Sequence, residues 1–163
     1  MAKIELPDHI LNALSTVLQQ LQQSLPELKQ IPDFSAHAYK WQHGELKPIH
    51  QLRQMELADL KGIERQKEKV IQNTLQFLNG LPANDVLLTG SRGTGKSSIV
   101  RALLTEYADQ GLRLIEIERD DLSDLPQIQR LIAERPEKFI VYCDDLAFNA
   151  EDENYRSLKS VLD

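Results

Sequence analysis

The sequence has little cysteine and no long apolar run. Its 163 residues contain one cysteine, Cys143, so no disulfide can form within the chain, which fits a reducing compartment. No apolar run approaches the roughly 20 residues that a membrane-spanning helix needs, and the N-terminus lacks the apolar segment of a signal peptide. These absences predict a cytoplasmic protein without a membrane span.

Basic residues are also in the minority. The chain has 19 Lys and Arg against 25 Asp and Glu, a net charge of −6. Dedicated nucleic-acid binders usually carry a basic surplus, so nucleic acid is not indicated as a partner. Three scattered histidines (His37, His43 and His50) lack the regular ligand spacing of a zinc site, and we expect them to be solvated or packed.

Only seven glycines occur in the chain, and three of them fall within six residues, at positions 90, 93 and 95. The stretch "GSRGTGKS", residues 90–97, fits the pattern G-x-x-x-x-G-K-[ST] without a mismatch. It lies between an apolar stretch and an amphipathic one, which is the strand–loop–helix context that a phosphate-binding loop requires. The alternative is a flexible turn with no ligand, and the sequence context favours phosphate binding over it.

The residue types in this loop suit a nucleotide triphosphate. Glycines allow positive φ and bring backbone N–H groups close to phosphate oxygens, and the following helix adds its positive N-terminal end. Lys96 can reach the β- and γ-phosphates and stabilise charge during transfer, and Ser97 can ligate Mg²⁺. The expected cofactors are therefore ATP and Mg²⁺, and the expected binding residues are Gly90, Ser91, Arg92, Gly93, Thr94, Gly95, Lys96, Ser97 and Ser98. Solvent exposure for Arg92 and an ordinary helical role for Ser98 stay open.

A second acidic element follows a buried strand. The stretch "FIVYCDD" ends in Asp144 and Asp145. Ligands of open α/β sheets bind beyond the carboxyl ends of the strands. We expect Asp144 to hold Mg²⁺ and Asp145 to orient or deprotonate an attacking water. Cys143 is expected to be a buried small residue and not a nucleophile.

Periodicity predicts an α/β fold with a parallel sheet flanked by helices. Expected helices cover residues 63–79, 95–110 and 126–135, and a further one begins near residue 154. Expected strands cover residues 84–89 ("NDVLLT"), 112–118 and 138–145. A leucine stripe over residues 8–31 predicts N-terminal helices, either packed on their own domain or available to a partner or for self-assembly. Residues 31–52 read as turn-rich.

The chain resembles an uncharacterised bacterial family of AAA+-type ATPases classed as a domain of unknown function. The likeness runs through residues 60–104, through "GLRLIEIERDDLSDLP" and through "FIVYCDDLAFNAEDENYRSLKSVLD", covering the chain from about residue 38. It implies that Lys96 and Ser97 act on phosphate and magnesium and Asp144 on magnesium. It also places the adenine near Gly62 and Ile63, where helix entry alone is the other interpretation. The wider superfamily usually has Glu where this chain has Asp145, which puts the hydrolysis rate in question but not binding.

The resemblance also implies missing parts. The sensor strand, the helical lid and the arginine finger of AAA+ proteins have no counterpart here. We therefore expect residues 1–50 to form a helical region and linker, and residues 51–163 to be the first part of an incomplete P-loop domain. Such a chain would lack the middle strand of its own sheet, expose unpaired strand edges, and aggregate or stay loosely folded.

Three other functions are alternatives to an ATPase. A GTPase should carry an N-K-x-D motif for guanine, and none occurs. A small-molecule kinase stays open, although paired aspartates on a distal strand suit an ATPase better. A nucleotide-dependent binding module that does not hydrolyse ATP, with the N-terminal helices as a docking arm, is the non-catalytic alternative.

Overall fold

The fold is taken from a computed structural model, which describes residue 17 and residues 32–146. The chain divides into two compact units, Met1–Ile31 and Pro32–Asp163. The helices expected over residues 8–31 and from residue 154 lie outside the described part.

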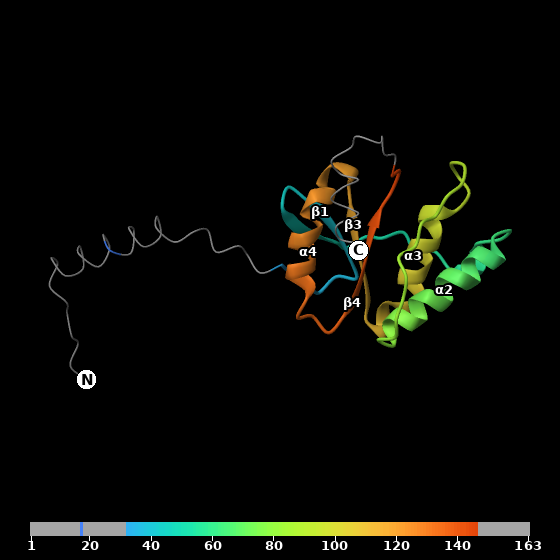
Figure 1. Cartoon of the computed structure of the whole chain (residues 1–163), viewed down its shortest axis with the longest axis horizontal. Coiled ribbons are helices and arrows are strands. Elements are labelled where there is room, and N and C mark those ends of the chain that lie inside the picture. Colours follow the sequence, from blue (N-terminus) through green and yellow to red (C-terminus); the bar gives the residue numbers. More distant parts are fainter. Residues whose placement is uncertain (1–16, 18–31, 147–163) are drawn as a thin grey trace. The chain divides into compact units, whose positions relative to one another are not determined.

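A four-stranded sheet organises this unit (Figure 1). Its strands are β1 (Ala38–Gln42), β2 (Glu45–Ile49), β3 (Leu112–Ile117) and β4 (Lys138–Cys143), in the order β2-β1-β3-β4. The pairs β1–β3 and β3–β4 are parallel, and only the hairpin β1–β2 is antiparallel. The expected α/β fold with a largely parallel sheet is confirmed, as are the strands expected near residues 112–118 and 138–145.

Helices flank this sheet. They are α2 (Glu64–Leu78), α3 (Lys96–Tyr107) and α4 (Leu125–Ile132), with short 3₁₀ helices η1 (Leu57–Asp59), η2 (Ala108–Gln110) and η3 (Arg119–Asp124). All three α-helices were expected within a few residues. Gly111, in a left-handed conformation, follows η2, and Pro126 lies in the first turn of α4, as the sequence indicated. No helix in residues 32–146 is both long and apolar enough to cross a bilayer.

Two apolar clusters cover the two faces of the sheet. Leu114 and Ile140 pack on the side of α3, whereas Ile115 and Val141 pack on the side of α4. This alternation is the period of two that a β-strand imposes on its side chains. Since β3 and β4 contribute apolar residues to both sides, their near-continuous apolar sequences reflect burial between two helical layers.

The turn-rich expectation for residues 31–52 is wrong. Residues 38–49 form the β1–β2 hairpin, and β1 joins the parallel sheet beside β3. The hairpin turns at His43 and Gly44, with φ of 54° and 77°, the positive values that tight two-residue hairpin turns use. Pro48 lies in β2, an edge strand, where a missing N–H is tolerated. The polar residues of both strands and the proline of β2 favoured a turn-rich segment when read from sequence. The hairpin therefore lies within residues 1–50, which were expected to be a helical region and linker.

The strand expected at residues 84–89 is also wrong. These residues form no regular secondary structure and pair with no strand of the described part, and β4, with β3 as its one neighbour, ends the sheet. Val86 and Leu87 are 48% and 75% exposed, whereas Leu88 packs on the α3 side. The segment is anchored instead by Asn73 of α2, whose side chain exchanges two hydrogen bonds of 2.8 Å with the Asn84 backbone. The apolar composition of residues 84–89 favours a strand, but a strand also needs a neighbouring strand for its backbone hydrogen bonds.

The exposure of this segment predicts a small effect of mutation. Leu87→Ala should change the free energy of unfolding by no more than about 0.5 kcal/mol, because little apolar area is lost from the core. Leu103→Ala, at a position 1% exposed in α3, is the matched comparison and should cost about 2–5 kcal/mol. Urea denaturation followed by circular dichroism measures both. A cost for Leu87→Ala close to that for Leu103→Ala would show that the segment is packed in solution.

Candidate functional site

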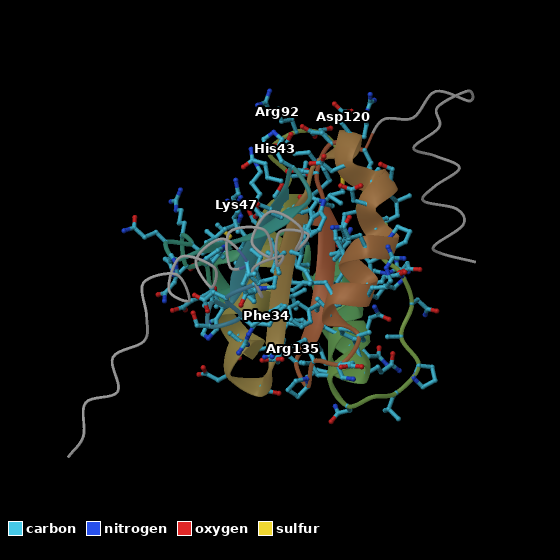
Figure 2. All side chains as sticks on the ribbon, turned by 90° about the vertical axis from the view of Figure 1, so that its left-hand side faces the viewer. Phe34, His43, Lys47, Arg92, Asp120 and Arg135 are labelled. Atoms are coloured by element: carbon cyan, nitrogen blue, oxygen red, sulfur yellow. The ribbon has the colours of Figure 1, made fainter. Side chains whose placement is uncertain are left out.

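The candidate residues gather at one edge of the sheet. The parallel strands β1, β3 and β4 all end there, and the glycine-rich loop, residues 90–95, leads into α3 at the same edge. Figure 2 shows Arg92, His43 and Asp120 at this end of the molecule, and Phe34 and Arg135 at the opposite end. Sequence segments some 50 residues apart therefore meet where ligands of parallel sheets usually bind.

The loop has the backbone that its glycines predict. Gly90, Gly93 and Gly95 have φ of 146°, 81° and 88°, values that L-residues seldom adopt. At Gly90 a Cβ would lie 3.2 Å from Oγ1 of Thr94, so a side chain there would also crowd the loop. The Thr94 hydroxyl donates to the carbonyl of Ser91 at 2.8 Å and closes the turn. The loop is thus held by a hydrogen bond within itself and is exposed to solvent.

Lys96, the first residue of α3, folds back over the loop. Its Nζ donates hydrogen bonds of 2.9 Å to the carbonyls of Gly90 and of Ser91. The ammonium therefore lies within the loop and not in solvent beyond it. A positive charge at this position, next to the N-terminus of a helix of 12 residues, makes the loop attractive to an anion.

Ser97 and Asp144 are brought together from α3 and from the end of β4. The Ser97 hydroxyl donates to Oδ2 of Asp144 at 2.8 Å, and the backbone N–H of Asp145 donates to Oδ1 at 3.0 Å. Desolvation opposes ionisation of Asp144, but the hydrogen bonds from Ser97 and from the Asp145 N–H and the positive charge of Lys96 outweigh it, so the pKa of Asp144 is lowered. The carboxylate is ionised at neutral pH.

This pair fits a magnesium ion by the chemistry of its donors. Mg²⁺ prefers hard oxygen ligands and takes one or two from protein, with water and phosphate completing its shell. An ionised carboxylate and a hydroxyl in direct contact supply that set, beside a loop whose lysine can neutralise phosphate. Ser97 and Asp144 would hold the ion, which would supply positive charge beside the loop.

Asp145 lies beside this pair in an unusual conformation. Its φ is 51°, in the left-handed region that only Asn, Asp and a few other non-glycine residues enter with any frequency. Its side chain is exposed at the open edge of the sheet. Such backbone outliers cluster at functional sites, because the surrounding structure must hold them in place.

The predicted adenine segment touches the loop. Cδ1 of Ile63 lies 3.5 Å from where a Cβ would stand on Gly95. Gly62, with φ of 78°, donates its N–H to the Glu64 carboxylate at 2.9 Å. Lys67 of α2 fixes the chain ahead of it by donating to the carbonyls of Leu57 and Leu60 at 2.9 and 3.1 Å. Residues some 30 positions upstream thus form one wall of the loop.

Two expected binding residues are not drawn into these contacts. Arg92 is exposed at the tip of the loop, and Ser98 is half-buried in the first turn of α3. Within the described residues, no hydrogen bond joins either side chain to the rest of the site. Arg92 and Ser98 therefore lie near the glycine-rich loop but form no hydrogen bonds with it.

Sequence reasoning missed Tyr142. Its ring packs against the apolar cluster on the α3 side, and burial raises its pKa to about 12. The signal was available, because side chains two residues apart on a strand share a face, so Tyr142 had to lie on the side of Asp144. Cys143 points to the other face, and burial raises the pKa of its thiol to about 11, which keeps it protonated at neutral pH.

Comparison with known proteins gives one assignment. No curated protein and no solved structure matches the chain. A family model described as "Protein of unknown function (DUF815)" matches residues 34–163, which include every described element of the second unit. The chain belongs to the family "Protein of unknown function (DUF815)".

Proposed function

We propose that residues 90–97 form a P-loop that binds ATP with Mg²⁺, and that the chain is an AAA+-type ATPase. The observation that carries this proposal is the 2.8 Å contact between the Ser97 hydroxyl and the Asp144 carboxylate, two residues 47 positions apart in sequence. A hydroxyl at the start of a helix and a carboxylate at the end of a strand form the magnesium pair of such sites. The lysine beside them and the glycine-rich backbone supply the phosphate contacts.

Each residue has a distinct role in this proposal. Backbone N–H groups of Gly93, Gly95 and Lys96 bind phosphate oxygens at the helix N-terminus. Lys96 exchanges its carbonyl partners for the β- and γ-phosphates and stabilises the negative charge that develops on transfer. Ser97 and Asp144 would hold the magnesium ion, which would supply positive charge to the bound phosphates. Asp145 orients the attacking water and accepts its proton, and Ile63 and Gly62 contact the base.

The AAA+ assignment rests on the sequence resemblance and on a compatible sheet. The fold has parallel strands between helices and the loop at their carboxyl edge, which is compatible with an ATPase of this class, although the segment before the loop pairs with no strand of the described part. Asp145 takes the place of the usual Glu and is one methylene shorter. A short acid at the catalytic position favours slow hydrolysis, so the second candidate is a module that binds ATP, changes conformation and docks a protein partner without turnover.

Nucleotide binding and hydrolysis should be measured together. Labelled ATP and GTP are titrated with the 163-residue chain in Mg²⁺ and in EDTA, and phosphate release is followed in parallel. Binding that favours ATP and strengthens with Mg²⁺ supports the proposal, and phosphate release selects the ATPase over the binding module. Absence of binding to either nucleotide would refute the proposal.

The role of Asp145 makes a separate prediction. Asp145→Asn keeps nearly the same size and tolerates the same positive φ, so ATP affinity should stay within about twofold. Phosphate release should fall by about 100-fold or more, because an amide cannot accept the proton of the attacking water. Asp109→Asn, an acidic residue of η2 at the other end of α3, is the matched control and should leave both quantities unchanged. Normal hydrolysis by Asp145→Asn would remove this residue from the mechanism.

A further inference from the structure

We infer that Lys67 is a positioning residue that holds an apolar wall against the glycine-rich loop, so that the loop prefers a nucleoside triphosphate to a bare polyphosphate. The apolar wall consists of Leu60 and Ile63, which lie between η1 and α2. This inference rests on the proposed function, because it concerns the same site. It names the residue that keeps the nucleoside side of that site in place before a ligand binds.

The apolar wall adjoins the end of the loop. From the position where a Cβ would stand on Gly95, Cδ1 of Ile63 lies 3.5 Å away and Cδ2 of Leu60 lies 4.0 Å away. Leu60 is buried, whereas Ile63 is half-buried and keeps part of its side chain accessible to a ligand. Such a surface favours the flat face of a nucleotide base over a phosphate, because burying apolar area stabilises only a partner that is itself partly apolar.

The chain that carries the apolar wall has little regular structure of its own. Helix η1 is a single turn, Leu57–Asp59, and residues 60–63 belong to neither η1 nor α2. Gly62, with φ of 78°, lies within this stretch, and a glycine gives the backbone more conformations to choose from than any other residue does. Short segments of this kind open locally at a low cost in free energy unless other contacts restrain them.

Lys67 supplies such a restraint, because it ties both ends of η1 to α2. Its Nζ donates to the carbonyl of Leu57 at 2.9 Å and to the carbonyl of Leu60 at 3.1 Å. Hydrogen bonds from a charged donor are stronger than neutral ones, and Lys67 is half-buried, which limits competition from water. Helix α2 has 15 residues and contacts α3 (Figure 1). Lys67 thereby fixes the apolar wall relative to the helix that follows the loop.

A wall that is already in place lowers the cost of binding a nucleotide. If the wall moved freely, only the fraction of molecules with the wall against the loop would contact the base, and the apparent affinity for ATP would fall with that fraction. A ligand that makes no contact with the wall would be unaffected. Inorganic tripolyphosphate presents three linked phosphates without a nucleoside, so it separates the effect of the wall from that of the loop.

The test compares ATP with inorganic tripolyphosphate. Calorimetric titration in Mg²⁺ gives the Kd of each ligand for the 163-residue chain and for Lys67→Met, which keeps an unbranched stem but has no donor. The affinity for ATP should fall about tenfold in Lys67→Met, and the affinity for tripolyphosphate should stay within about twofold. Lys69→Met, at an exposed position of α2, is the matched control and should equal wild type for both ligands. Lys67→Arg keeps a charged donor and should recover part of the loss.

A second measurement needs no ligand. Amide hydrogen exchange of the unliganded chain should be about tenfold faster over residues 57–63 in Lys67→Met than in wild type, because the restraint on this stretch is gone. Exchange over β3, in the middle of the sheet, should not change, which shows that the variant is folded. Unchanged exchange over residues 57–63 would show that Lys67 does not hold the wall.

The binding outcomes separate this inference from the proposed function. If wild type binds ATP and Lys67→Met binds it equally well, the positioning role is refuted and the proposed function stands. Equal losses for ATP and tripolyphosphate also refute the role, because Lys67 would then act on the whole site. So does a wild type that binds ATP no more tightly than tripolyphosphate. If wild type binds neither ligand, the proposed function itself fails, and the preference inferred here fails with it.

Discussion

Replacing Lys96 by alanine is expected to weaken ATP binding by about 100-fold or more. The ammonium already lies inside the loop, 2.9 Å from the carbonyls of Gly90 and Ser91. It is therefore already placed where a phosphate bound in the loop would contact it. It would make at least two charge-assisted hydrogen bonds there, each contributing about 1.5 kcal/mol or more, and 1.4 kcal/mol corresponds to a factor of ten. Titration of labelled ATP in Mg²⁺ measures the loss.

Two further variants make this result specific. Lys69→Ala removes an exposed lysine from α2 and controls for the change in net charge, so its ATP affinity should equal that of wild type. Lys96→Arg keeps the charge but presents a planar group of a different shape, and recovery should be partial at most. If Lys96→Ala bound ATP as well as Lys69→Ala does, the loop would not be the phosphate site.

The second large effect concerns stability. Trp41→Ala should destabilise the fold by about 3–5 kcal/mol, the usual cost of removing a buried aromatic side chain. Trp41 is 1% exposed on β1, within the cluster on the α4 side, and its Nε1 donates to Oδ2 of Asp124 at 2.9 Å. The variant loses the packing of β1 and also leaves an acceptor ahead of α4 without its donor.

Urea denaturation followed by circular dichroism measures this cost. Trp41 is the only tryptophan, so fluorescence cannot be compared between the two proteins, but in wild type it reports directly on this cluster. Trp41→Phe is the intermediate variant, which keeps an aromatic ring but loses the hydrogen bond, and it should cost less than Trp41→Ala. A cost of under about 1 kcal/mol for Trp41→Ala would mean that β1 is not packed in the sheet.

Elements with a strong local signal were predictable from sequence. Helix α3 follows a glycine-rich turn and ends before Gly111, and β4 is a short apolar stretch that a turn and two aspartates enclose. Periodicity and end signals agree in both cases, so the local and the global preferences coincide. The hairpin β1–β2 was hidden because its turn uses His43 and Gly44 and its edge strand contains Pro48, features that favour a loop when read locally.

The error at residues 84–89 has a different origin. Asn84 to Thr89 has the composition of a buried strand, and no local signal contradicts that interpretation. Whether such a segment forms a strand depends on a neighbour with free N–H and C=O groups alongside it, which is a property of the assembled sheet. Among the described strands, β4 presents an open edge, yet the segment is tied to α2 through Asn73 and not to β4.

Much of the candidate site was predictable for a related reason. Gly90, Gly93 and Gly95 allow the positive φ angles of the loop, so the motif at residues 90–97 predicts its own backbone conformation. The alternation of side chains along β4 predicts the face of the sheet on which Asp144 lies. The contact between Ile63 and Gly95 joins segments whose proximity no local pattern encodes.

The placement of Lys96 also bears on which anions the loop can accept. Its ammonium is solvated by the chain itself, so an entering ligand must replace two carbonyl hydrogen bonds before it gains anything from the positive charge. A singly charged or compact anion offers little more than those carbonyls do, whereas a polyphosphate offers several oxygens and more charge. Under the proposed function, an ion such as chloride, with one charge and no second atom to accept from the loop, would therefore compete poorly with a polyphosphate.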